Sequence, residues 1–202
     1  MKVCVLGTGS LGSTIGGALA KAGNEVHFVG RQAHMDAVNK DGLVMVTPTG
    51  EEVAHPVGHT TPDGIGVCDL VIVLCKAFDT KATMEEGKEL VGADTAVMSL
   101  QNGLGAEDAL SEVVGADHVI GGKTYIGGML LEPGRVQATI PGKDTYIGEL
   151  DGTISDRVQK IGKAVPIRVN KLFRLLFQIP KCRRFQLAIV RFRQLFADEL
   201  VE

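Results

Sequence analysis

A glycine-rich turn directly after a short apolar segment is the feature that most constrains how this chain folds. Residues 2–6 are rich in valine, as a strand buried on both faces is, and they run into Gly7-Thr8-Gly9-Ser10-Leu11-Gly12. Residues 13–22 have helical spacing and stop at Gly23-Asn24, and residues 25–29 read as a second strand. The segment predicts a strand–helix–strand unit with a right-handed parallel crossover, the opening of a Rossmann fold.

If the turn holds the pyrophosphate of a dinucleotide, each of its glycines is needed for a different physical reason. Gly7 permits the tight turn, Gly9 lets the backbone approach the phosphates, and Gly12 lets the helix pack closely on the strand. The free N–H groups and the dipole of the helix favour an anion there. A lone glycine turn is a weak signal, and its place between strand and helix gives it weight. The candidate cofactor-binding residues here are Gly7, Thr8, Gly9, Ser10, Leu11 and Gly12.

The end of the second strand favours NADP(H) over NAD(H). NAD-specific sites usually place an Asp or Glu there to bind the ribose hydroxyls, whereas this chain has Gly30-Arg31-Gln32. No carboxylate would repel a 2′-phosphate, and the Arg31 guanidinium could pair with it. The alternative for Arg31 is a solvated surface arginine.

Strand and helix patterns alternate along the next hundred residues, so the fold class is α/β: a mostly parallel sheet with helices on both faces. We expect an irregular region over 36–66, with a short helix and hairpin-like segments. Further strands are expected at 69–75, 96–100, 118–121, 135–140 and 145–147, and helices at 79–90 and 107–114.

Two polar residues stand just past apolar strands, at the edge of a parallel sheet where ligands bind. Lys76 ends the first of these segments, and Asn102 follows the other within Gln101-Asn102-Gly103-Leu104-Gly105. The alternative interpretation is a solvated strand terminus for Lys76 and an ordinary Asn-Gly turn for Asn102.

Composition excludes several classes of protein. Hydrophobic residues make up 45% and charged residues 22%, the net charge is −3, and no apolar run reaches the ~18 residues of a membrane helix. We therefore expect neither a nucleic-acid nor a membrane partner. The apolar run at the N-terminus stops at Gly7, too soon for a secretion signal, which favours a cytoplasmic location. The cysteines show no C-x-x-C spacing and the histidines are scattered, so no metal site is expected.

The chain changes character near Val165, which divides it into residues 1–165 and a tail of residues 166–202. Most of its phenylalanines and many arginines fall in the tail. Residues 184–201 have the spacing of an amphipathic helix, preceded by Pro180. A helix docked on its own domain or on a partner is the favoured interpretation, and a membrane-surface or calmodulin-target helix is the alternative.

The order of these motifs resembles the ketopantoate reductase (2-dehydropantoate 2-reductase) family over roughly residues 1 to 165. The motifs that carry the resemblance are the glycine turn, Arg31, Leu74-Cys75-Lys76-Ala77, residues 101–105, Gly121-Gly122-Lys123-Thr124-Tyr125-Ile126-Gly127, Glu132-Pro133-Gly134-Arg135-Val136 and Thr145-Tyr146-Ile147-Gly148.

The resemblance implies NADPH-dependent reduction of 2-dehydropantoate to pantoate, a step toward pantothenate. It places Gly7–Gly12 at the pyrophosphate, and Arg31 and Lys76 at the adenosine phosphate end. It also places Asn102 by the nicotinamide ribose and the substrate, and Gly127 along the cofactor with its backbone.

The tail departs from the family pattern, in which an all-helical second domain supplies a lysine as general acid. Lys171 and Lys181 lack the surrounding pattern and the chain has no Trp, so no catalytic residue is assigned. The tail would then be a truncated or frameshifted remnant of that domain, and surface left uncovered on residues 1–165 would favour a homodimer or aggregation. Two alternatives stay open: a non-catalytic NADP(H)-binding module, and a related 2-keto acid or opine-type dehydrogenase.

Overall fold

The glycine turn does join a strand to a helix. This computed structural model describes residues 1–140, 145–164 and 168–169. Strand β1 (Lys2–Leu6) leads into helix α1 (Ser10–Lys21), and β2 (Glu25–Val29) lies parallel to β1. Both strands have the predicted bounds. Helix α1 begins three residues earlier than expected, because the Ser13 amide already donates to the Gly9 carbonyl oxygen at 2.9 Å.

The main sheet has eight strands in the order β12-β11-β8-β7-β6-β1-β2-β5. Strands β5 to β8 all run parallel to β1, and β11 is antiparallel to β8. The order β5-β2-β1-β6-β7-β8 is that of a Rossmann sheet, with its topological switch point between β1 and β6. The bounds of these strands are β5 (Val57–His59), β6 (Leu70–Val73), β7 (Ala96–Ser99), β8 (Val119–Thr124), β11 (Thr145–Glu149) and β12 (Arg168–Val169).

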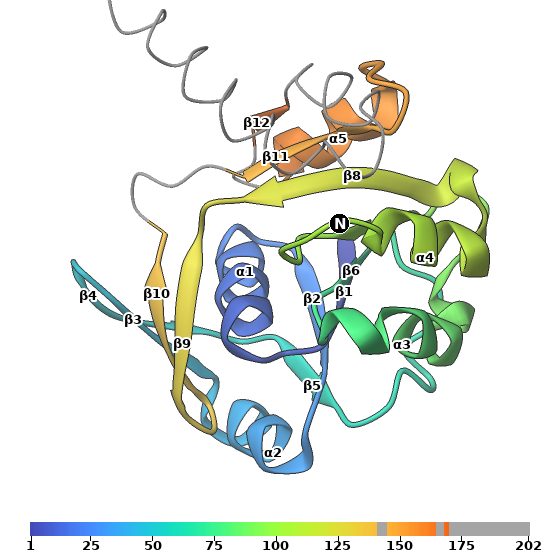
Figure 1. Cartoon of the computed structure of the whole chain (residues 1–202). Coiled ribbons are helices and arrows are strands. Elements are labelled where there is room, and N and C mark those ends of the chain that lie inside the picture. The colour runs from blue at the N-terminus through green and yellow to red at the C-terminus, as the bar shows by residue number, and fades with distance from the viewer. Residues whose placement is uncertain (141–144, 165–167, 170–202) are drawn as a thin grey trace, which may run out of the picture.

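Helices cover both faces of this sheet, as predicted (Figure 1). On one face α1, α2 (Gln32–Asp41) and α5 (Asp156–Ala164) bury apolar side chains against alternate strand residues such as Val5 and Ile72. On the other face α3 (Thr80–Glu86) and α4 (Ala106–Val114) pack on Leu6 and Val73. Short 3₁₀ turns lie at Ala77–Asp79, Lys88–Leu90 and Ala116–His118.

A second sheet, which the sequence did not predict, packs on the far side of α1 (Figure 1). Its strand order is β4-β3-β10-β9, and its strands are β3 (Leu43–Thr47), β4 (Gly50–Ala54), β9 (Gly127–Glu132) and β10 (Arg135–Thr139). Helix α1 fits between the two sheets because it presents a glycine to each of them. A Cβ at Gly16 would lie 2.1 Å from Phe28, and one at Gly17 would lie 2.6 Å from the Met45 sulfur.

One expected helix needs correction, and two elements were not predicted. Strand β9 was not predicted, because its segment contains adjacent glycines. The helix expected at 79–90 is divided at Gly87, where a Cβ would lie 2.6 Å from Leu6. Helix α5 was not expected either. The predicted helix at 184–201 and the domain division at residue 165 lie outside the described residues. Within the described part of the chain, no helix is both long and apolar enough to cross a bilayer.

Candidate functional site

The three glycines of the first turn occupy three different environments. Gly7 has φ of +97°, and a Cβ on it would lie 2.5 Å from the Cys75 amide nitrogen. A Cβ on Gly12 would lie 2.2 Å from the Gly7 carbonyl oxygen. In contrast, apart from Gly9 itself and its two chain neighbours, no described heavy atom lies within 4 Å of a Cβ built on Gly9. Gly7 and Gly12 are therefore required by packing, whereas Gly9 leaves space open at the start of α1.

The N-terminus of α1 has the properties of an anion site. Gly9 is its N-cap, no described side chain caps the helix, and its first turn contains no acidic residue. The first amides of a helix lack intrahelical acceptors, and the helix dipole adds partial positive charge. Ser10 and Leu11 supply two of these amides. The Ser10 side chain is already used, because its Oγ accepts a hydrogen bond from the Leu130 amide at 3.0 Å.

Thr8 differs from its neighbours because its side chain is buried. Its hydroxyl lies 3.4 Å from the Val29 carbonyl oxygen, and a Cβ on Gly30 would lie 2.0 Å from the same hydroxyl. The Thr8 side chain thus ties the glycine turn to the end of β2. Any contact of Thr8 with a ligand would have to come from its backbone.

Arg31 begins the segment that follows β2, at the same sheet edge as the glycine turn. It is exposed and forms the N-cap of α2, and the first turn of that helix contains no acidic residue. The absence of a carboxylate beside Arg31, noted in the sequence, therefore extends through the first turn of α2. The chain just after β2 therefore combines an arginine side chain with the positive end of the α2 dipole.

Lys76 and Asn102 both lie at this edge, since β6 pairs parallel with β1 and β7 pairs parallel with β6. Both are exposed. A residue without a predicted role, Gln101, joins their two loops. Its Nε2 donates to the Cys75 carbonyl oxygen at 2.7 Å, and its Oε1 accepts from the Thr80 hydroxyl at 3.0 Å. Gln101 thus links the backbone that precedes Lys76 to the backbone that precedes Asn102.

Gly127 reaches this region through the second sheet rather than the first. It starts β9, whose next residue, Gly128, packs against α1 so closely that a Cβ would lie 2.1 Å from the Thr14 hydroxyl. The Thr139 hydroxyl donates to the Gly127 carbonyl oxygen at 3.0 Å. The β9–β10 hairpin therefore carries Gly127 beside the first turns of α1, a placement that the sequence pattern alone could not show.

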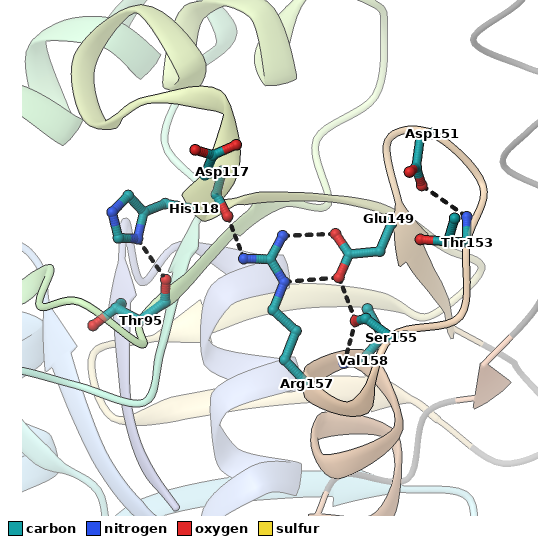
Figure 2. A network of polar contacts seen from close by, with 9 residues as sticks. All are labelled: Thr95, Asp117, His118, Glu149, Asp151, Thr153, Ser155, Arg157 and Val158. Carbon is teal, nitrogen blue, oxygen red and sulfur yellow. Dashed lines mark hydrogen bonds and ion pairs between the residues drawn. The ribbon is translucent and has the colours of Figure 1, made fainter.

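Figure 2 shows a polar network that joins α5 to β11 and to the turn before β8, and none of the candidate site residues belongs to it. The Arg157 guanidinium donates hydrogen bonds to both carboxylate oxygens of Glu149, at 2.7 Å from Nε to Oε1 and 2.6 Å from Nη2 to Oε2. It also donates to the Asp117 carbonyl oxygen, and Ser155 donates to Glu149. Burial would raise the pKa of Glu149, but the hydrogen bonds from Arg157 and Ser155 outweigh it and lower that pKa below its usual 4.5. Because β11 runs antiparallel to β8, Glu149 lies where the parallel strands begin.

Comparison with known proteins gives one consistent family. The family described as Ketopantoate reductase PanE/ApbA matches residues 3–152. Among curated relatives, a 2-dehydropantoate 2-reductase of Halobacterium salinarum is 40% identical over 167 residues, which cover 81% of this chain and 54% of the relative. This chain spans about half the length of the curated relatives it matches.

Solved structures agree in fold. The 2-dehydropantoate 2-reductase of Geobacter metallireducens GS-15 has a TM-score of 0.77 at 29% identity, and the match covers 87% of this chain and 61% of that one. A D-mandelate dehydrogenase in complex with NADH has a TM-score of 0.70 at 25% identity, and the match covers 81% of this chain and 52% of that one.

Proposed function

This chain belongs to the ketopantoate reductase family, and from that membership we propose that it binds NADP(H) and serves the reduction of 2-dehydropantoate to pantoate. One observation carries the proposal: of the three glycines in the turn, Gly9 alone opens onto free space, at an uncapped helix N-terminus. This is the arrangement that a pyrophosphate needs, because backbone amides can then approach it without intervening side chains.

The chain's own residues divide the binding task along the sheet edge. The first-turn amides of α1, from Ser10 to Gly12, hold the pyrophosphate. Arg31 pairs with the 2′-phosphate, a role that suits a planar guanidinium with no acidic residue in the helix turn that follows. Lys76 supports the adenosine phosphate end, and Gly127 lines the cofactor with its backbone.

The reducing equivalent is the cofactor's contribution, a hydride from its nicotinamide ring. Asn102 is assigned to the nicotinamide ribose and to the keto acid, since its amide can both donate and accept hydrogen bonds. We assign the general acid to no described residue, and Lys171 and Lys181 lie outside the described part of the chain.

A second candidate function is the NADH-dependent reduction of a different 2-keto acid. The similarity to a D-mandelate dehydrogenase in complex with NADH favours considering it. The two candidates differ in what they require of Arg31, because NADH has no 2′-phosphate for the guanidinium to pair with.

The test is a direct titration with NADPH and with NADH, followed by a turnover assay with 2-dehydropantoate and with a 2-keto acid that has an aromatic side chain. Tighter binding of NADPH together with oxidation of NADPH by 2-dehydropantoate is the expected result. Binding without turnover would support a non-catalytic NADP(H)-binding module. If neither dinucleotide binds, the proposal is wrong at its first step.

A further inference from the structure

Helix α2 contributes a buried histidine, His34, for which the proposed cofactor contacts have no use. Its side chain lies between α1 and the β9–β10 turn, and the residue is only 5% exposed. Its Nε2 is 2.9 Å from the Ser13 Oγ, and its Nδ1 is 2.9 Å from the Gly134 amide nitrogen. One imidazole thus bridges two segments separated by more than a hundred residues of sequence.

The partners of His34 fix its tautomer. The Gly134 amide can only donate, so Nδ1 must be unprotonated to accept from it. A neutral imidazole then carries its proton on Nε2 and donates it to Ser13. The Ser13 hydroxyl in turn donates to the Thr8 carbonyl oxygen at 3.0 Å, inside the glycine turn. The result is a directed chain of hydrogen bonds that runs from Gly134 through His34 and Ser13 to Thr8.

The same hairpin is attached to α1 at a second place. The Leu130 amide donates to the Ser10 Oγ at 3.0 Å, and Gly128 packs against the Ser10 carbonyl oxygen, which a Cβ would approach to 2.8 Å. His34 therefore holds the hairpin at its turn, and Ser10 holds it along β9. This is the hairpin that begins with Gly127.

We propose that His34 is a positioning residue that holds the glycine turn and the β9–β10 hairpin in their dinucleotide-binding arrangement, and that it does so only while its imidazole is neutral. The inference rests on the proposed cofactor function. A proton on Nδ1 would set two donors against each other at Gly134 and break the attachment of the hairpin. Loss of one neutral hydrogen bond corresponds to a change of about three- to tenfold in affinity.

The surroundings of His34 favour the neutral imidazole. Burial lowers its pKa below the usual 6.5. Helix α1 has no charged residue before Lys21. The titratable groups on the other elements around His34 are already paired or exposed. On the N-terminal part of its own helix these are Arg31 and Asp36, both exposed. On β5 it is His59, which is paired with His27. Beside Gly134 they are Glu132, which is exposed, and Arg135, which is paired with Glu51.

Two uncharged variants separate the two arms of the bridge. A Gln side chain places its amide near the position of Nε2, so His34→Gln keeps a donor for Ser13 and cannot be protonated. An Asn side chain places its oxygen near Nδ1, so His34→Asn keeps an acceptor for Gly134 but does not reach Ser13. Both are titrated with NADPH beside the wild type in the full chain from pH 5 to pH 8, with folding at each pH checked by circular dichroism.

We expect the ratio of the NADPH dissociation constants, wild type over His34→Gln, to be constant above pH 7 and to rise about three- to tenfold as the pH falls below 6.5. Taking the ratio cancels the titration of the 2′-phosphate itself. At pH 7.5 we expect both variants to bind NADPH more weakly than the wild type, because each lacks one arm of the bridge. Parallel pH profiles for wild type and His34→Gln, or equal affinity of all three proteins at pH 7.5, would overturn the inference alone. A wild type that binds no dinucleotide at any pH would contradict the proposed function as well.

Discussion

The ion pair between Arg157 and Glu149 offers a sharp test of what holds α5 to the sheet. Arg157→Met keeps most of the apolar stem of the side chain but removes the guanidinium, and with it three hydrogen bonds. The Glu149 carboxylate, whose side chain is only 11% exposed, would be left with Ser155 as its partner.

The expected loss follows from the burial of the pair. Breaking a fully buried pair costs about 3–5 kcal/mol, whereas an exposed pair contributes about 0–1 kcal/mol. The Arg157 side chain is 33% exposed. We therefore expect Arg157→Met to lower the free energy of unfolding by about 2–3 kcal/mol, which lies between those limits. Urea denaturation followed by circular dichroism measures it.

The double variant Arg157→Met/Glu149→Gln identifies the cause. If the cost comes from an unpaired buried charge, removing that charge should recover about 1 kcal/mol or more relative to Arg157→Met. Affinity for NADPH should stay unchanged in both, because the pair lies at the edge of the sheet opposite the glycine turn. A loss below about 0.5 kcal/mol, or no recovery in the double variant, would refute this reasoning.

The pH dependence of stability has a definite sign here. Because the pKa of Glu149 is lower in the folded chain than its usual 4.5, the pair stabilises the fold fully above pH 4.5. That contribution is lost as the pH falls through the folded-state pKa. In Arg157→Met the guanidinium no longer offsets burial, so the pKa of Glu149 should rise, and the free energy of unfolding should fall less on acidification than it does in the wild type.

Three further predictions concern the candidate site. Gly9→Ala should change the free energy of unfolding by less than about 1 kcal/mol but weaken NADPH binding about tenfold or more. Gly12→Ala should instead lower the free energy of unfolding by about 1–3 kcal/mol. Urea denaturation and NADPH titration of both variants measure the difference. Arg31→Ala should weaken NADPH binding by about tenfold or more and leave NADH binding nearly unchanged; equal loss for both would remove Arg31 from the 2′-phosphate. Thr80→Val should cost about 1–2 kcal/mol of stability by removing the donor to Gln101, with Thr80→Ser as the control that keeps the hydroxyl.

The glycine turn shows how far local sequence reaches. Its place between a valine-rich strand and a helix predicted the Rossmann unit. It also predicted that Gly7 and Gly12 are needed for a tight turn and for close packing of helix on strand. These features depend on neighbours in sequence, and their periodicity is legible without a structure. The positions of Lys76 and Asn102 at one edge also followed, because parallel strands align their carboxyl ends.

The contacts that unite the site are of another kind. Gln101 carries no periodicity, and only the pairing of β6 with β7 brings its amide to the Cys75 carbonyl oxygen. Strand β9 was missed because its glycines suit close packing on α1 rather than strand propensity. In the sequence His34 is one of several scattered histidines, and only the fold shows its contacts with Ser13 and Gly134.

The sequence by itself determined the fold class, the bounds of the first strands, the glycine turn between strand and helix and the family resemblance, since each depends on residue order within a short segment. Only the tertiary structure decided that a second sheet covers α1, that the hairpin from Gly127 meets the glycine turn, and which polar groups are buried together. Such contacts join residues far apart in the chain, and they exist only once packing has brought those segments to hydrogen-bonding distance.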